Sequence, residues 1–320
     1  MAPVIIKDMN KHWRDSNINA FTWVKSLDKI MQEIKLPEFN GPLILLFSDS
    51  SGYEKTSKYT AISFIVIDLF NSNEWEAKRR YIRKYLLPNN RRMSFKKLND
   101  SHKRNSLIPF LDAANCIDGL LINFLLNKKL KGLVTYQGVL DKWKEKLGLK
   151  WKWSENQFTK MFETAHFASI LIGALGKDNQ EIYWISDQDE IFANPIKHQD
   201  VSTILSGLGN IYIQHNPSKL GVGTSEMDPG DRAEEDLIAV ADLAAGAMVD
   251  FVNNCDNSPN WKKNSGTIVI ENSKDKSNDI ISWLSDTNSR LKKVNIVFDE
   301  SNISGISIRR FNIRKSKIII

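Results

Sequence analysis

The sequence has few cysteines and no long apolar run, and these two absences exclude several classes of protein. Only two cysteines occur among the 320 residues, Cys116 and Cys255, and neither has a metal-ligand neighbour at short spacing. A zinc site and a disulfide framework are therefore not expected. The longest apolar run, residues 61–70, is interrupted by Ser63 and Asp68. It is much shorter than the roughly 20 residues that cross a bilayer.

Targeting and nucleotide-binding motifs are also missing. The first residues contain no long apolar core of the kind found in a signal peptide. No glycine-rich phosphate loop or dinucleotide fingerprint occurs, because the glycine cluster at 221–230 lacks the lysine and the following helix. We therefore expect a cytoplasmic protein that does not bind membranes.

Positive charge is present but unevenly distributed. The formal net charge is +6. The segment 78–104 has eleven lysines and arginines against one acid, Asp100, so it carries +10 and the rest of the chain −4. A basic patch on a mildly acidic protein indicates an anionic partner.

Aromatic side chains lie among these basic residues, namely Tyr81, Tyr85 and Phe95. Such a segment is expected to follow a phosphate backbone while its rings stack on bases. The alternative is a solvated charged face. The predicted nucleic-acid-binding residues are Arg79, Arg80, Arg83, Arg91, Arg92, Lys96 and Lys97.

Hydrophobic patterning predicts an α/β protein. Strands are predicted at 43–47, 59–69, 74–87, 132–136, 181–186 and 211–214. Helices are predicted at 21–34, 106–129, 155–175, 203–208 and 231–252. Antiparallel strands come first and helices then alternate with strands, which indicates a mixed sheet with helices packed on it.

The chain is expected to have three parts. Residues 1–40 form an N-terminal helical extension, and residues 41–255 form the core domain. A polar stretch with proline and glycine follows at 256–266. Residues 260–320 are predicted to be a small C-terminal α+β appendage, through which the protein could bind a protein partner or form a homo-oligomer.

Three aspartates stand out by their context. Asp49 follows the apolar run at 43–48, and Asp187 follows the predicted strand 181–186, so both lie at strand ends. Ligands of open α/β sheets gather at the carboxyl ends of strands. Asp242 lies among apolar and small residues of the predicted helix 231–252, where a buried carboxylate needs a cation, a metal or several donors.

These acids predict a metal site with oxygen ligands. Such ligands without histidine or cysteine suit Mg²⁺ or Mn²⁺, and a pair of these ions can clamp both oxygens of a phosphoryl displacement. The predicted catalytic residues and metal ligands are Asp49, Asp187 and Asp242. The alternatives are a turn residue for Asp49, a loop acid for Asp187 and a buried salt bridge for Asp242.

The same residues carry a resemblance to a known family. A strand ending in SDSSG, a second strand-end aspartate in WISDQDE and a late helix with IAVADLAAGA resemble an uncharacterised bacterial family with an RNase H-like fold. Members of that family show a D-E-S-G-like start and a late L-Q-L-A-D-L-x-A-G-like helix. The resemblance covers about residues 43–252, and Ser50 stands where the family often has glutamate.

The resemblance implies a fold, an activity and a context. It implies an RNase H-like mixed sheet with flanking helices, and it matches the family's acids to Asp49, Asp187 and Asp242. Family members are suspected of roles in phage defence or mobile elements. Such enzymes usually have a fourth acid. The candidates for it are Asp112, Asp118, Asp189, Glu190 and Glu235, of which we include Asp189 and Glu235 among the predicted metal ligands.

Three functions are compatible with these features. The first is a nuclease that uses Mg²⁺ or Mn²⁺ to hydrolyse DNA or RNA, as a defence or mobile-element effector. The second is a non-catalytic subunit of a defence complex that binds nucleic acid or a partner with the basic segment. The third is a metal-dependent hydrolase of nucleotides or other small phosphoesters.

Overall fold

The structure is a computed structural model, and it describes most of the chain in ten ranges. These are residues 4–5, 22–68, 73–89, 91–130, 133, 144–228, 230–255, 267–270, 276–301 and 305–315. The chain divides into two compact units. The first contains Met1–Phe47 and Lys129–Glu234, and the second contains Ser48–Lys128 and Glu235–Ile320. Each unit combines strands with helices, so the protein is a mixed α/β protein.

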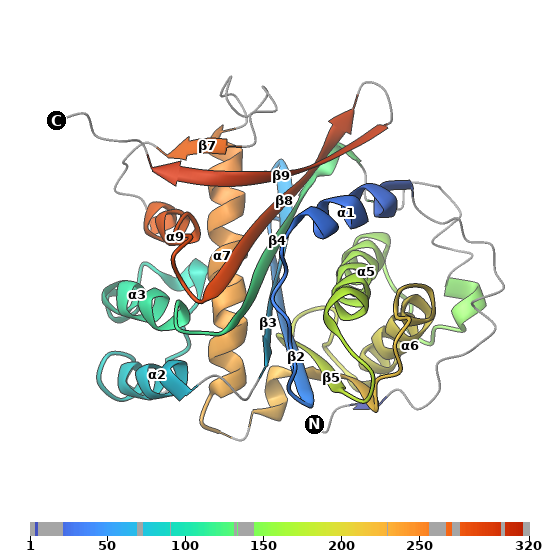
Figure 1. The fold of residues 1–320 in the computed structure, drawn as a ribbon, viewed down its shortest axis with the longest axis horizontal. Coiled ribbons are helices and arrows are strands. Elements are labelled where there is room, and N and C mark those ends of the chain that lie inside the picture. Colours follow the sequence, from blue (N-terminus) through green and yellow to red (C-terminus); the bar gives the residue numbers. More distant parts are fainter. Residues whose placement is uncertain are drawn as a thin grey trace. The chain divides into compact units, whose positions relative to one another are not determined.

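The strands of the first unit form a mixed sheet (Figure 1). Their order is β1 (Val4–Ile5), β6 (Lys219–Thr224), β5 (Glu181–Ser186) and the first part of β2 (Leu43–Ser51). Strand β5 runs parallel to β6, and β1 runs antiparallel to it. The parallel pair matters for function because its two carboxyl ends lie side by side.

The first unit also contains helices. They include α1 (Thr22–Glu33), α5 (Glu155–Leu175) and α6 (Pro195–Tyr212). Local chemistry starts two of them, since Ser154 caps α5 and Asn194 caps α6 through their side-chain oxygens. His166 of α5 bonds Tyr212 of α6 at 2.8 Å between Nε2 and the hydroxyl. Burial lowers the pKa of His166 to about 3, so the imidazole is neutral and acts as part of the core.

The second unit has the longer strands. Their order is the end of β2, then β3 (Tyr59–Asp68), β4 (Gly119–Asn127), β8 (Leu291–Ser301), β9 (Gly305–Lys315) and β7 (Thr267–Ile270). Two of the pairings are antiparallel (β3 with β4, β8 with β9) and two are parallel (β4 with β8, β7 with β9). Every residue of β3 is buried, which agrees with its largely apolar sequence.

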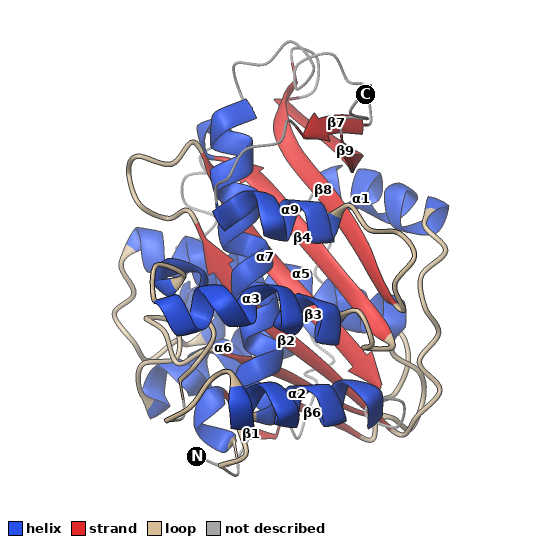
Figure 2. Cartoon of the chain, turned by 90° about the vertical axis from the view of Figure 1, so that its left-hand side faces the viewer, coloured by secondary structure: helices blue, strands red, loops and turns tan. Residues whose placement is uncertain are grey.

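The helices of this unit lie on one face of its strands (Figures 1 and 2). They are α2 (Asn73–Tyr85), α3 (Ser101–Ala114), α7 (Ala233–Cys255) and α9 (Lys276–Leu284). A 3₁₀ turn, η3 (Phe95–Lys97), contacts α7, because a Cβ on Gly246 would lie 2.2 Å from the Phe95 ring. The small residues of α7 therefore allow close packing, as their sequence predicts.

Several elements are confirmed by the structure. The predicted helix 155–175 and strand 181–186 have the same bounds as α5 and β5. The predicted strands 43–47 and 59–69 correspond to β2 and β3, and the helix 231–252 corresponds to α7. The predicted α/β class with a mixed sheet is thus correct at this level.

Other predictions were wrong. Residues 74–87 form helix α2 rather than a strand, because Trp75, Arg79 and Ile82 are buried at helical spacing. Residues 106–129, predicted as one helix, contain the end of α3 and then β4. The prediction was wrong because the apolar residues of the two adjacent elements together resemble a single helical pattern. The predicted strand 211–214 begins within α6, and the next strand is β6. The predicted strand 132–136 lies outside the described residues except for Leu133.

The predicted three-part division also differs from the two units. Residues 1–3 and 6–21 of the predicted N-terminal extension lie outside the described residues. In the C-terminal part, β8 pairs with β4 in parallel from Gly119↔Leu291 to Leu126↔Phe298. The C-terminal strands therefore extend the sheet of the second unit.

Candidate functional site

Polar side chains gather where the parallel strands β5 and β6 end. Ser186 and Thr224 form the last paired position, so Asp187 and Ser225 are the first residues beyond it. The Ser225 hydroxyl donates to Asp187 Oδ1 at 3.0 Å, and the Gln188 amide donates to the same oxygen at 3.0 Å. The strand-end position predicted for Asp187 is confirmed. Carboxyl ends of parallel strands are where α/β proteins bind ligands.

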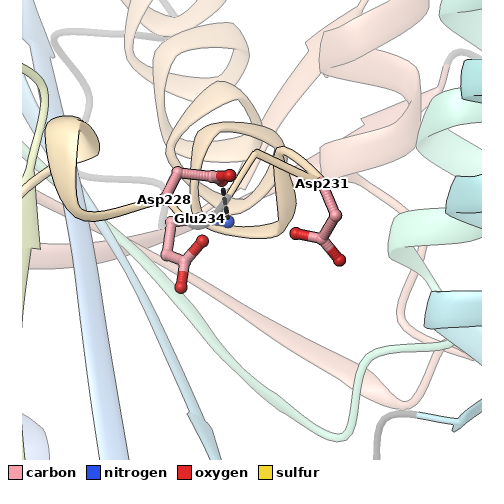
Figure 3. Close-up of side chains that lie close together, drawn as sticks. All are labelled: Asp228, Asp231 and Glu234. Atoms are coloured by element: carbon pink, nitrogen blue, oxygen red, sulfur yellow. Dashed lines mark hydrogen bonds between the residues drawn. The ribbon is translucent and has the colours of Figure 1, made fainter.

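The chain then forms a cluster of acids, Asp228, Asp231 and Glu234, which we call the acidic cluster. Each offers one carboxylate oxygen, and these oxygens lie within 4.8 Å of one another (Figure 3). The cluster follows the 3₁₀ turn η5 (Ser225–Met227) and leads into α7. Across the described ranges of the chain, it is the one group of three or more such metal-ligating side chains that meets this spacing.

The two aspartates also stabilise the start of α7. Asp228 Oδ1 accepts hydrogen bonds from the amides of Gly230 (2.9 Å) and Arg232 (2.8 Å), and its Oδ2 accepts from the amide of Glu234 (3.1 Å). Asp231 Oδ1 accepts from the amide of Ala233 at 3.2 Å. These bonds satisfy amides that lack a partner within the helix. A carboxylate has about four lone-pair sites, so it retains capacity for a further ligand.

Glu234 has no comparable structural role. Burial, a hydrogen bond with Asp228 and the charges of Asp228 and Asp231 together raise the pKa of Glu234 to about 7. Its Oε2 is buried and has no hydrogen-bond partner among the described residues. The three carboxylates therefore repel one another, and near neutral pH a proton on Glu234 reduces this repulsion.

The acidic cluster fits a hard divalent cation. Two oxygens on opposite sides of Mg²⁺, Mn²⁺ or Ca²⁺ are about 4–5 Å apart, since each metal–oxygen distance is about 2.0–2.6 Å. The cluster oxygens lie within 4.8 Å of one another, so they are close enough to share one ion. The N-terminus of α7 opposes a cation with only about half an elementary charge. Three formal carboxylate charges outweigh that.

The predicted metal ligands are distributed over both units. Asp187 and Asp189 belong to the first unit, whereas Asp49, Asp242 and Glu235 belong to the second. Asp189 bonds Lys160 Nζ at 2.7 Å and the amide of Ile191 at 2.8 Å, so it fixes a loop. A joint site of Asp49, Asp187 and Asp242 stays a prediction.

Within the second unit, the two predicted acids have clear local contacts. The position predicted for Asp49, just after the end of its strand, is wrong, because β2 continues to Ser51. Asp49 lies inside β2, half-buried, and its Oδ1 accepts the amide of Ser50 at 2.6 Å. Asp242 is half-buried in α7, where its Oδ2 accepts the amide of Phe95 at 2.8 Å. This bond caps η3, whose own N-cap Ser94 makes no side-chain cap bond. Glu235 is half-buried at the start of α7.

Part of the basic segment is engaged inside the second unit. The Arg79 side chain is only 1% exposed and bonds Glu76 and Asp236, and Arg83 forms a two-pronged ion pair with Asp236. Arg91 bonds Asp100 at 2.5 Å. The prediction that Arg79 contacts nucleic acid is therefore wrong, because no phosphate reaches a buried guanidinium. Arg83 and Arg91 are held by carboxylates in the same way, although each is partly accessible.

The outer surface of α2 is different. Tyr81 and Tyr85 are 60% and 57% exposed, with their ring centroids 4.8 Å apart. Arg80 is 70% exposed and pairs with Glu76, and the Lys84 ammonium lies over the Tyr85 ring. We call these four residues the α2 surface. Lys96 and Lys97 are also exposed, and Arg92 is half-buried.

Comparisons with known proteins do not place the chain in a family. No protein-family model matches it, and a search of curated proteins returns no match. In the part of the chain that the structure describes, no helix combines the length and the apolar character needed to cross a membrane.

Proposed function

We propose that the protein binds a divalent cation at Asp228, Asp231 and Glu234 and hydrolyses phosphodiester bonds of nucleic acid. The observation that carries this proposal is the convergence of three carboxylates within 4.8 Å, directly after a strand of a parallel pair. A bound Mg²⁺ or Mn²⁺ would supply charge stabilisation for the displacement at phosphorus. The RNase H-like arrangement and a role in phage defence or mobile elements are part of the proposal and rest on the resemblance of the motifs.

The chain's own residues have separate tasks in this proposal. Backbone amides hold the Asp228 carboxylate in place, so it is oriented before any ligand binds. Glu234, whose pKa is raised to about 7 in the cation-free site, must release its proton to bind the cation. Asp187 accepts the hydroxyl of Ser225, the first residue after β6, and is thus a predicted acid at this strand edge.

A cleavage assay tests the proposal directly. The full chain is incubated with end-labelled single-stranded DNA, single-stranded RNA, their duplexes and a small phosphodiester, with Mn²⁺ or with EDTA. We expect cleavage of a nucleic acid with Mn²⁺ and none with EDTA. Cleavage that persists in EDTA, or hydrolysis of the small substrate alone, would contradict it.

A second candidate function is binding of nucleic acid without cleavage, and the α2 surface favours it. Aromatic rings that are more than half exposed are costly to leave in water, and flanking cations suit a phosphate backbone. The pair Tyr81 and Tyr85 is spaced one helical turn apart, which suits stacking on unpaired bases. This surface belongs to the second unit and the acidic cluster to the first, so each is tested separately.

We predict that changing both tyrosines to serine weakens binding of single-stranded nucleic acid. Each stacking contact contributes about 1–3 kcal/mol, so the double variant Tyr81→Ser/Tyr85→Ser should lose at least roughly tenfold in affinity. Fluorescence anisotropy in EDTA measures binding without turnover. The matched control is Ile108→Ser on α3, an exposed apolar residue outside the α2 surface. Equal losses in both variants would show that the tyrosines are not the contact.

A further inference from the structure

The second unit contains a cavity of about 390 Å³ that is unrelated to the acidic cluster. It lies between the loop after α9, the first residues of β8 and the last residues of β9. Its apolar wall consists of Leu284, Leu291 and Ile313, each at most 5% exposed. Its size falls within the range of small-molecule sites, about 300–1,000 Å³.

The charged lining of the cavity is strongly unbalanced. Four cations line it, Arg290, Lys292, Lys293 and Arg310, against the single carboxylate of Asp286. That carboxylate accepts the amide of Asn288 at 2.9 Å and the side-chain amide of Asn115 at 3.4 Å, so it holds the loop. The formal charge of the lining is 4 − 1 = +3.

The two arginines of the lining keep their charge accessible to a ligand. Arg290 pairs with Glu74 at 3.3 Å, but both side chains are exposed, and such pairs are weak. Arg310 is exposed on β9 and has no ion-pair partner among the residues that the structure describes. Its planar guanidinium can hold two phosphate oxygens at once.

Lys293 forms the charged floor of the cavity. Its ammonium donates to Asn115 Oδ1 (2.8 Å), Ser289 Oγ (2.7 Å) and the Asp286 carbonyl (3.3 Å), and it lies 4.8 Å from the Trp283 ring. None of these acceptors is a carboxylate. Burial lowers the pKa of Lys293 to about 8, since partial removal from water disfavours the charged form. An anion in the cavity would offset this cost.

We propose that this cavity binds a small molecule that carries a phosphate or diphosphate group. The anion would contact Arg310 and Lys292 above Lys293, and the remainder of the ligand would lie against Leu284, Leu291 and Ile313. The inference is independent of the proposed nuclease activity, because it uses different residues in a different unit. Inorganic pyrophosphate and a nucleoside diphosphate share this chemistry, and the experiment separates them.

Isothermal titration calorimetry on the full chain in EDTA tests the site with pyrophosphate, ADP and uncharged adenosine. We expect pyrophosphate, ADP or both to bind, more weakly as salt increases, and adenosine not to bind. Binding of ADP alone identifies a ligand that also needs the apolar wall. The substitution Arg310→Glu should weaken binding at least roughly tenfold, because a charged hydrogen bond is replaced by repulsion.

The matched control is Arg314→Glu, an exposed arginine on the same strand that does not line the cavity. It makes the same change in net charge and should alter affinity less than about twofold. Equal weakening by the two variants would show a diffuse charge effect and overturn the proposal. Absence of binding by both phosphate probes at millimolar concentration would overturn it as well, as would binding only of a nucleic-acid strand.

Discussion

Replacing Asp228 with asparagine is expected to weaken Mn²⁺ binding by roughly 100-fold and to remove the metal-dependent cleavage proposed above. Asparagine keeps one oxygen that can accept the amides of Gly230 and Arg232, so the turn before α7 should persist. It removes one of the three negative charges and the oxygen that accepts the Glu234 amide. Titration followed by electron paramagnetic resonance of free Mn²⁺ gives the affinity.

The control is Asp178→Asn in the same unit. Asp178 is exposed and accepts the Asn216 amide at 2.7 Å, so it shares the local chemistry of Asp228 without belonging to the acidic cluster. It should bind Mn²⁺ as the parent does. If Asp228→Asn also bound Mn²⁺ with the parent's affinity and cleaved as fast, the assignment of the cluster would be wrong.

The pH dependence gives an independent signature of the same site. The pKa of Glu234 is raised to about 7, so a cation must displace a proton near that pH, and affinity should fall as the pH drops below 7. The folding stability of the cation-free protein depends on pH in the opposite direction, because it increases as the pH drops. The protonated carboxyl favours folding, and this contribution is lost as pH rises through about 7. Glu234→Gln should therefore stabilise the cation-free protein above pH 7.

Where the sequence predicted the fold correctly, a single physical signal was sufficient. The segments that became β3, β5 and α5 each have one clear pattern, a continuous apolar run or a helical period, bounded by residues that end it. The failure at 106–129 has an equally simple cause. The apolar face of α3 is followed within five residues by the apolar strand β4, and periodicity alone cannot separate the two.

The acidic cluster was not predicted, although a signal for it exists. Asp228, Asp231 and Glu234 recur at three-residue spacing around the start of a long helix, where acids are typical because they cap the helix and favour its dipole. Capping and metal binding use the same residue types. Only the mutual distance of the three carboxylates distinguishes the cluster from an ordinary helix start, and the local sequence pattern does not contain that distance.

The burial of Arg79 and the pairing of Arg83 could not be predicted from the sequence. The sequence shows that arginines are abundant between 78 and 104, but the partner of Arg79 and Arg83 is Asp236, more than 150 positions away. Such a pairing leaves no local pattern, since it depends on how α2 and α7 pack. The excess charge of the segment is therefore smaller at the surface than the composition indicates.

The ion pairs of Asp236 are expected to contribute strongly to the stability of the fold. Asp236→Ala should destabilise the protein by about 3–5 kcal/mol, because it leaves the Arg83 guanidinium without a carboxylate and leaves the buried Arg79 with Glu76 alone. The Asp236 side chain is 1% exposed and accepts Arg83 at 2.5 and 2.9 Å and Arg79 at 3.4 Å. Chemical denaturation followed by tryptophan fluorescence measures the change.

Asp279→Ala is the matched control, because it breaks an exposed pair with Arg104 in the same unit. Exposed pairs contribute at most about 1 kcal/mol, so equal losses for Asp236→Ala and Asp279→Ala would contradict the prediction. Replacing Arg79, Arg83 and Asp236 together by methionine, methionine and leucine should restore much of the stability. It follows that charge reversal of Arg79 or Arg83 would reduce nucleic-acid binding by unfolding the unit, and only a surface residue such as Arg80 reports on the contact itself.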